Sequence, residues 1–428
     1  MSTSRKKSTS SQSFLRKGWE RLTQSLQDTA FIWWDEMKQA VKDEGVLIFF
    51  ILVPLAYPLL YSWIYNNEVV RDVPVVVVDD SHSQLSRQFV RLCDASPDVK
   101  FLSYAADLDE AKSLLSRQVA RGIYYFPSDF ESKVCRMEPA VVSVYCDMSL
   151  MLCYKAVFQT AQTVSMQMGA DITTRLGGHY TRREEQIAAQ PLAFEEVPIF
   201  NPTGGYGSFI IPAVLMLIIQ QTLVLGIGLS AGTARERNRY RNLIPISRHY
   251  NGMFRIVAGK SLAYFMIYAV ITAYLVFVVP RLFGFTAIGR RYDVLTFLLP
   301  YLLDCIFFGM VVSCIVRYRE NVMLLMVFVT VPLLFLSGAV SWPQSSIPPF
   351  WQAVSWLFPS TFGIRGFIRI NEMGGTLADV LLEYQVLWIQ TCAYFITACM
   401  VYRYQIFLAR KEARQRLADI QKAARASQ

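Results

Sequence analysis

The chain has 428 residues, of which 53% are hydrophobic and only 18% are charged. This composition is too apolar for a soluble enzyme of that length and indicates a membrane protein. The net charge of +9 is concentrated in segments beside apolar runs. It therefore reflects membrane topology and attraction to lipid head groups, and we do not take it as a sign of nucleic-acid binding.

The first 45 residues are polar and of mixed charge. Residues 1–29 begin as a Ser-, Thr- and Lys-rich stretch, and we expect them to form a disordered cytoplasmic tail. Residues 30–45 predict an amphipathic helix at the membrane interface, and a plain extension of the first span is the alternative. The apolar face of that helix consists of Phe31, Trp34, Met37 and Val41.

Six apolar runs are long enough, at about 20 residues each, to cross a hydrocarbon core about 30 Å thick. They lie at 46–65, 206–231, 256–279, 295–316, 322–341 and 385–407. No small-residue cleavage site follows the first run, which indicates a retained anchor.

Lys and Arg are unevenly distributed between these runs. Residues 1–45 carry eight, residues 232–260 carry seven and the tail from Arg403 carries seven, whereas residues 342–384 carry two. Short loops rich in Lys and Arg stay in the cytoplasm, so both termini are expected there, with residues 411–428 as a basic tail.

Residues 66–205 separate the first two spans and carry 13 Lys and Arg against 18 Asp and Glu. The segment "VPVVVVDD" at 73–80 is a β-branched run that ends in acidic turn residues, and it predicts a strand buried on both faces. Similar strands are expected at 99–104, 120–126 and 140–146, alternating with helical patterns. The pattern predicts an α/β domain on the extracytoplasmic side.

The sequence lacks a nucleotide-binding loop of its own. "GKS" at 259–261 resembles the end of a P-loop, but the glycine required five residues earlier is Phe254. Any ATPase must therefore be a different polypeptide.

Metal ligation is not expected either, because the histidines at 82, 179 and 249 are far apart and have no ligand spacing. Four cysteines, Cys93, Cys135, Cys146 and Cys153, fall in the predicted outer domain, where a disulfide stays open as a prediction.

Asp304 lies near the middle of the fourth apolar run. A carboxylate at that depth costs about 3 kcal/mol and needs a partner or water. Asp304 is therefore a candidate for the substrate pathway, and packing in a neutral or hydrogen-bonded form against another helix is the alternative.

The order of segments along the chain is recognisable. It consists of one span, a large outer domain and then five spans, with a basic loop after the second span. From about Trp33 to Leu408 it resembles the ABC type-2 exporter permease family, in its half-size bacterial branch with a large extracytoplasmic domain. The implied fold is a mainly α membrane protein with six transmembrane helices, an inserted α/β domain at 66–205, a five-helix domain at 206–410 and re-entrant helices before the last span.

Two segments carry the family's functional features by resemblance. In the segment 343–370 and just before it, prolines and glycine break the helix, which implies re-entrant pieces that cap the translocation route; an interfacial loop with aromatic anchors is the alternative. The matching residues are Ser337, Gly338, Pro343, Pro348, Pro349, Trp351, Pro359 and Arg365.

The loop 232–255 looks like the coupling helix that touches the ATPase, and it is about one turn shorter than is usual in the family before its proline. The alternative is that its arginines only set the membrane topology. After this loop, Gly259 and Lys260 match the family's "GK" ahead of the third span. The predicted ATPase contacts are Arg235, Glu236, Arg237, Arg239, Arg241 and Pro245.

The resemblance implies a permease subunit in a bacterial cytoplasmic (inner) membrane that exports a lipophilic or amphipathic molecule. Its partners would be a cytoplasmic ABC ATPase, which holds ATP and Mg, a second permease that is identical or a sibling, and membrane lipid, with an envelope or periplasmic adaptor as an open further partner. This chain would hydrolyse nothing and carry no cofactor. Two rival functions stay open: an envelope mechanotransmission or assembly protein driven by an ABC ATPase, and a membrane-bound sensor or scaffold.

Overall fold

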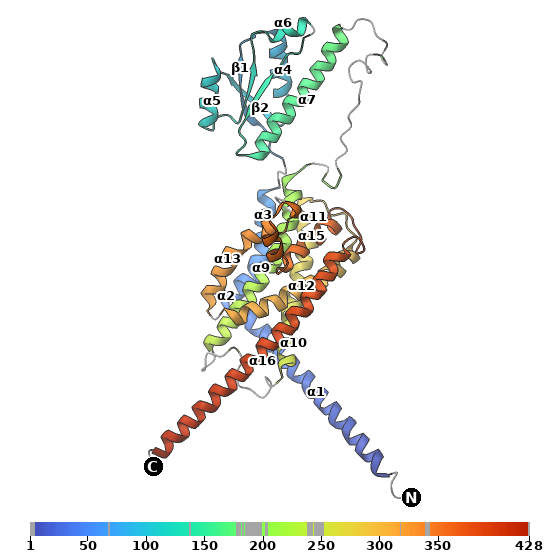
Figure 1. Ribbon diagram of the computed structural model, residues 1–428, viewed down its shortest axis with the longest axis vertical. Coiled ribbons are helices and arrows are strands. Elements are labelled where there is room, and N and C mark those ends of the chain that lie inside the picture. The colour runs from blue at the N-terminus through green and yellow to red at the C-terminus, as the bar shows by residue number, and fades with distance from the viewer. Residues whose placement is uncertain are drawn as a thin grey trace. The chain divides into compact units, whose positions relative to one another are not determined.

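A computed structural model describes residues 5–66, 69–136, 138–176, 199–201, 204–237, 252–316, 318–338 and 343–426, together with Thr181, Glu184 and Leu243. It contains two compact units (Figure 1). The helical unit comprises Met1–Asn66 and Gly205–Gln428, and the inserted unit comprises Asn67–Gly204.

Within the described residues, six helical segments of the helical unit are long and apolar enough to cross a membrane. They coincide with the six predicted runs. The first is built from α2 (Glu44–Leu47), η1 (Ile48–Leu52) and α3 (Val53–Ile64), and the third from α10 (Met253–Ala273), η3 (Tyr274–Val278) and α11 (Val279–Phe283). The others are α9 (Tyr206–Arg237), α12 (Arg291–Ile315), α13 (Arg319–Leu336) and α16 (Leu381–Ala426).

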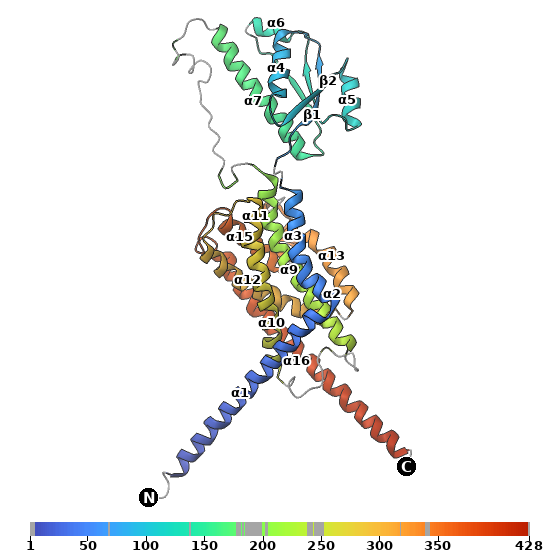
Figure 2. The same cartoon turned by 180° about the vertical axis from the view of Figure 1, so that it is seen from behind.

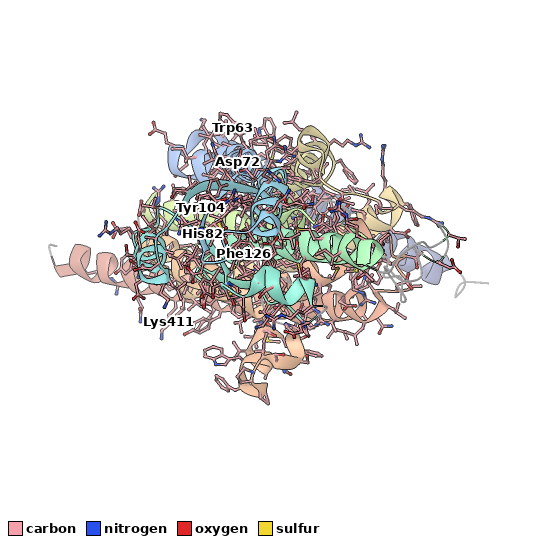
Figure 3. The ribbon with its side chains drawn as sticks, turned by 90° about the horizontal axis from the view of Figure 1, so that it is seen from above. Trp63, Asp72, His82, Tyr104, Phe126 and Lys411 are labelled. Atoms are coloured by element: carbon pink, nitrogen blue, oxygen red, sulfur yellow. The ribbon has the colours of Figure 1, made fainter. Side chains whose placement is uncertain are left out.

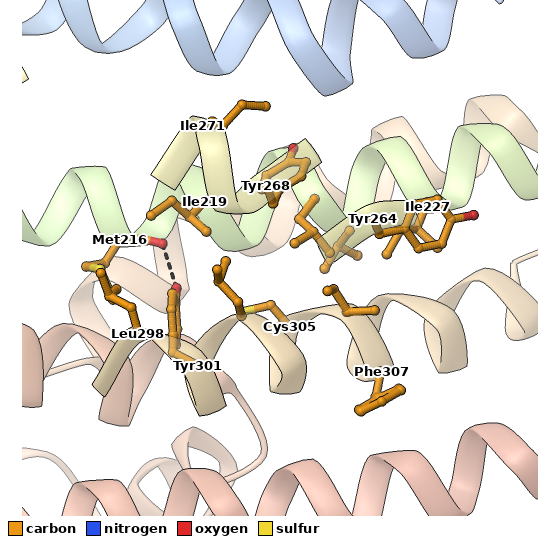
Figure 4. Packing of buried hydrophobic residues seen from close by; sticks show 14 of the residues in the cluster. Met216, Ile219, Ile227, Tyr264, Tyr268, Ile271, Leu298, Tyr301, Cys305 and Phe307 are labelled. Carbon is orange, nitrogen blue, oxygen red and sulfur yellow. Dashed lines mark hydrogen bonds between the residues drawn. The ribbon is translucent and has the colours of Figure 1, made fainter. Parts of the chain in front are cut away.

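The core of the helical unit lies around α9 and α12. The most apolar 18-residue stretches of these two helices are 89% and 72% buried. Tyr301 of α12 donates a hydrogen bond of 2.6 Å to the carbonyl oxygen of Met216 on α9, so its hydroxyl is satisfied inside an apolar core (Figure 4). The peripheral helices expose large apolar side chains, for example Trp63 on α3 (Figure 3) and Phe328 on α13, which are 73% and 74% exposed. Such surfaces suit contact with lipid or another membrane helix.

Both chain ends are more helical than expected. The tail 1–29 was predicted to be disordered, but α1 is one helix from Arg5 to Lys42 and includes the segment predicted as a separate interfacial helix. Residues 5–29 have no proline and a single glycine, so nothing in them interrupts a helix that is continued by residues 30–42. Likewise α16 continues through the predicted basic tail to Ala426. Figures 1 and 2 show both helices extending beyond the packed helices at the same end of the helical unit.

The inserted unit contains a four-stranded sheet in the order β2-β1-β3-β4. Strands β1 (Val73–Asp79), β2 (Val99–Tyr104) and β3 (Gly122–Phe126) are parallel, and β4 (Ser143–Cys146) pairs antiparallel with β3. All four strands fall within the predicted ranges. The helices α4 (Gln84–Asp94), α5 (Leu108–Ser116), α6 (Phe130–Cys135) and α7 (Met151–Leu176) follow in sequence order between and after them.

Strand β1 is buried on both faces, as its unbroken valine run predicts. Val75 and Val77 belong to the apolar cluster that includes α4 and α7, whereas Val76 and Val78 belong to the cluster on the α5 side. Helices therefore cover both sides of the sheet, as in other largely parallel sheets.

The eight cysteines of the chain are free thiols, so the structure has no disulfide in the inserted unit. Burial raises the pKa of Cys93 to about 12 and that of Cys146 to about 11. Both thiols are therefore protonated at neutral pH and poorly reactive.

Candidate functional site

Arg235 near the C-terminal end of α9 is turned into the protein. It is 9% exposed, and its guanidinium donates hydrogen bonds to the carbonyl oxygens of Val316 (2.6 Å) and Ser313 (2.9 Å) at the end of α12. The last carbonyls of a helix lack partners within the helix and attract a cation. Its side chain joins α9 to α12, because the helix continues where a loop was expected. The ATPase contact predicted for Arg235 stays a prediction.

Glu236, the next residue, points outward and is a better candidate for an external contact. Its Oε2 lies 3.6 Å from Nη1 of Arg319, the first residue of α13, and its side chain is 63% exposed. The second terminal nitrogen of Arg319 donates a 3.0 Å hydrogen bond to Oδ1 of Asp43. Arg319 thus joins α9, α13 and the start of the first span.

Asp43 is held by several groups between α1 and α2. Thr233 of α9 donates a 2.6 Å hydrogen bond to its Oδ2, and the N–H groups of Gly45 and Val46 donate to Oδ1, so Asp43 caps α2. Burial alone would raise the pKa of this carboxyl group, but the hydrogen bonds from Thr233 and Val46 and the charge of Arg319 outweigh it and lower the pKa. Asp43 is therefore a carboxylate at neutral pH.

Two turns before Asp43 on the same chain, Glu36 is buried inside the protein at 3% exposure. Its Oε1 pairs with Nζ of Lys260 on α10, which is itself 4% exposed. Its Oε2 accepts hydrogen bonds from Tyr264 (2.8 Å) and Ser230 (3.3 Å). Both oxygens of the buried carboxylate are thus satisfied, as a buried charge requires.

The two residues of the "GK" pair have separate physical roles in this contact. A Cβ atom on Gly259 would lie 2.9 Å from Cβ of Ile32 and 3.0 Å from the carbonyl oxygen of Thr29. Only glycine lets α1 approach α10 this closely, and the next residue, Lys260, then reaches Glu36.

A third pair extends the contact toward the N-terminus, where Asp28 binds Arg255 near the start of α10. We call Asp28, Glu36 and Asp43 the acidic ladder. Their spacings of eight and seven residues place them on one side of the helix. Each binds a cation that is distant in sequence, so the ladder fastens the N-terminal helix to α10 and α13.

The acidic ladder was not predicted. The charged face of residues 30–45 was taken to face water, but Glu36 faces α10, while Phe31, Trp34 and Val41 are the exposed side chains at 47%, 52% and 59%. The exposed apolar face remains compatible with the predicted position at a membrane interface. The spacing of Asp28, Glu36 and Asp43 by eight and seven residues could have indicated this contact from the sequence, because a helix face in water does not need acids at a regular spacing.

Four of the predicted ATPase contacts are not placed. Arg239, Arg241 and Pro245 lie outside the described residues, as does the side chain of Arg237, where α9 ends. Their proposed contacts stay predictions. Among the described residues no group of three His, Cys, Asp or Glu side chains is placed to hold a metal ion.

Beyond α13 the chain breaks where the sequence predicted it. Ser337 ends the helix, and Gly338 follows with φ of +71°, in the left-handed region that favours glycine. After the 3-10 turn η4 (Gln344–Ser346) come two short helices, α14 (Pro349–Ser355) and α15 (Pro359–Asn371). Each has proline as its first residue, where the missing N–H is tolerated. Pro343 and Pro348 directly precede η4 and α14.

The two short helices differ in exposure. In α14 the side chains of Phe350 and Trp351 are 69% and 49% exposed, and Trp351 borders an apolar pocket of about 500 Å³ beside the end of α13. In α15, Phe362, Ile364 and Phe367 are fully or almost fully buried. α15 contacts α9, α12 and α16, so it belongs to the packed interior of the helical unit.

Arg365 of α15 helps to anchor this segment. It donates a hydrogen bond to the side-chain oxygen of Gln344 in η4, and its guanidinium lies 3.8 Å from Oε1 of Glu383 at the start of α16. Arg369 lies 3.1 Å from the same oxygen, and Glu383 is 2% exposed. Two cations therefore neutralise one buried acid and bind α15 to α16.

Glu372, directly after α15, gives a pH-dependent prediction. Burial raises its pKa from 4.5 to about 8, and its Oε1 is shielded and has no hydrogen-bond partner within the described residues. The folded protein therefore keeps a proton that the unfolded chain loses, so stability falls as pH rises from about 4.5 to about 8. Glu372→Gln is expected to remove this loss, with a gain of a few kcal/mol at pH 9 and little change at pH 4, measured by thermal unfolding. Equal pH profiles for the two proteins would refute it.

Asp304 lies on α12 with 0% exposure, and neither carboxylate oxygen has a hydrogen-bond partner within the described part of the chain. Tyr301 and Cys305, its neighbours on the buried side, belong to the core around α9 (Figure 4). The side chain is thus enclosed by the protein, and its role in a pathway stays a prediction.

The sequence model of the ABC-2 family transporter protein matches residues 45–400. The chain belongs to the ABC-2 transporter family. No curated protein matches the sequence. Membership in the ABC-2 family makes the chain a multi-pass membrane component of an ABC transporter and implies an ABC ATPase subunit as its partner.

The ABC-2 match also locates the acidic ladder relative to the family's common region. Asp28, Glu36 and Asp43 precede residue 45, whereas the cations that they bind, Arg255, Lys260 and Arg319, lie inside the match. The N-terminal helix of this ABC-2 protein is therefore bound through charges to the region that defines the family.

Proposed function

We propose that this chain is the permease subunit of a bacterial ABC exporter that moves a lipophilic or amphipathic molecule outward across the cytoplasmic membrane. A separate ATPase subunit supplies the energy. Two permease chains, identical or sibling, complete the pathway, and both termini face the cytoplasm. Residues 66–205 form an α/β domain outside the membrane, and the segment 343–370 is re-entrant.

The observation that carries this proposal is the charged junction at the end of α9. Arg235 binds the end of α12, and Glu236 binds Arg319, which in turn binds Asp43. A force applied at the C-terminal end of α9 therefore reaches α12, α13 and the first span through polar contacts. Such contacts between helices can carry a push from one helix to the next.

The charge distribution supports the same orientation. Basic residues are concentrated in 1–45, 232–260 and the C-terminal tail, and both terminal helices extend beyond the packed helices at one end of the helical unit (Figure 2). A cytoplasmic ATPase would meet that end.

Glu236→Ala tests the coupling role. The Glu236–Arg319 pair is partly exposed and worth at most about 1 kcal/mol, so the variant should fold normally. We expect the transport per ATP hydrolysed to fall several-fold. The permease is expressed together with an ABC ATPase subunit with which it copurifies. ATP-driven uptake of rhodamine 6G and of a fluorescent phospholipid into inside-out vesicles is then measured alongside ATPase activity.

Glu320→Ala is the matched control, since Glu320 is an exposed acid in the first turn of the same helix as Arg319. Unchanged transport and complex formation in Glu236→Ala would show that the coupling contact is wrong. ATPase activity that depends on the permease without uptake of either probe would favour envelope mechanotransmission. No association with an ATPase would contradict the proposal and favour a sensor or scaffold.

A further inference from the structure

The inserted unit contains a pocket of about 750 Å³ bordered by β4, α4, α6 and α7. This volume lies in the range of sites for small organic ligands, about 300–1,000 Å³. Its walls are largely apolar and include three aromatic rings, Phe89, Phe130 and Phe158. All of its lining residues belong to the inserted unit.

Gly169 indicates that the space is kept open. It lies within the long helix α7 and borders the pocket, and a Cβ atom added there would meet no atom within 4 Å. Glycine within a helix costs about 0.5–1 kcal/mol relative to alanine. Close packing against the described residues does not explain that cost, and the missing side chain leaves room for a ligand.

The pocket has few polar groups, and the charge among them is negative. Among the described residues that line the pocket, Glu138 is the only charged side chain, and Gln162, Ser165 and Thr173 add uncharged polar groups. Arg136 lies 3.9 Å from Glu138, and both side chains are about half exposed or more, so this ion pair is weak. A cation in the pocket would find one carboxylate and aromatic faces, both of which attract positive charge.

We propose that this pocket binds a lipophilic cation of drug size, with its apolar body against the aromatic rings and its positive charge near Glu138. The absence of a side chain at Gly169 leaves space for the apolar body of the ligand. The carboxylate of Glu138 favours a ligand with a positive charge. This site is separate from the helical unit, and the proposal holds whether or not that unit exports the same molecule.

The test uses the full-length protein in lipid nanodiscs and two probes of nearly equal shape and opposite charge, tetraphenylphosphonium and tetraphenylborate. Binding is measured by isothermal titration calorimetry. Wild type should bind tetraphenylphosphonium more tightly than tetraphenylborate. Gly169→Phe should fill the pocket and weaken tetraphenylphosphonium binding about tenfold or more, whereas Gly169→Ala, the matched control, should leave binding unchanged.

Glu138→Gln provides an independent arm, because this exposed side chain can change without disturbing the fold. It should weaken tetraphenylphosphonium binding and strengthen tetraphenylborate binding, because the carboxylate attracts the cation and repels the anion, so the preference for the cation falls. Three results would overturn the proposal: no binding of tetraphenylphosphonium by wild type, equal affinity of wild type and Gly169→Phe, or equal preference for the cation in wild type and Glu138→Gln. Unfolding midpoints of all variants are recorded to show that each is folded.

Discussion

Lys260→Met is expected to destabilise the helical unit by about 3–5 kcal/mol, because it leaves the carboxylate of Glu36 buried without its cation. Methionine keeps most of the volume of the lysine stem, so the loss reports the charge. Thermal unfolding of the purified protein in nanodiscs measures it. The same variant should lose transport, since α1 would no longer be held against α10.

A second substitution separates charge from packing. Glu36→Gln in the Lys260→Met protein removes the unpaired charge, and the amide oxygen can still accept the hydrogen bond from Tyr264. Most of the lost stability should return. Lys42→Met, at an exposed lysine on α1, is the control and should change little. A Lys260→Met protein as stable as wild type would show that the buried pair does not form.

Gly363→Leu is expected to displace α15 and to cost at least about 1–3 kcal/mol. A Cβ atom at this position would lie 2.3 Å from Cε2 of Tyr301. Tyr301 cannot turn aside freely, because it is fully buried and its hydroxyl is bonded to the carbonyl oxygen of Met216. A Cβ atom added at Gly366, three residues later, would likewise lie 2.3 Å from Cζ of Phe297. The face of α15 toward α12 therefore has no room for side chains at these two positions.

The matched control on α15 is Ser360→Ala, which removes only a buried hydroxyl without a hydrogen-bond partner in the described part of the chain. It should retain stability and transport, whereas Gly363→Leu should lower the unfolding midpoint and reduce probe uptake. If the two variants behave alike, α15 does not pack on α12 as the structure shows.

The spans and strands were predictable because each depends on a local pattern. A run of about 20 apolar residues can satisfy its backbone in lipid only as a helix, and the valine run of β1 has no water-facing side. The helix break after α13 was also local, since Gly338 adopts a left-handed φ and the prolines that follow disfavour a helix. These features needed no knowledge of distant neighbours.

The charged contacts were not predictable in the same way. Glu36 and Lys260 are 224 residues apart, and a charged side chain is by default placed in water. Arg235 was assigned to a partner for the same reason, although it serves the carbonyls of α12. Which charges are buried depends on how the helices pack against one another. That packing cannot be inferred from any one segment of the sequence.

The position of the acidic ladder has a practical consequence for anyone producing this protein. A shortened version that starts where the family's common region starts, at residue 45, would discard Asp28, Glu36 and Asp43. Arg255 and Lys260 would lose their acidic partners, and Arg319 would keep only its partly exposed pair with Glu236. Trimming the amino end to improve expression would thus remove a structural part, and affinity tags are better placed ahead of an intact first helix.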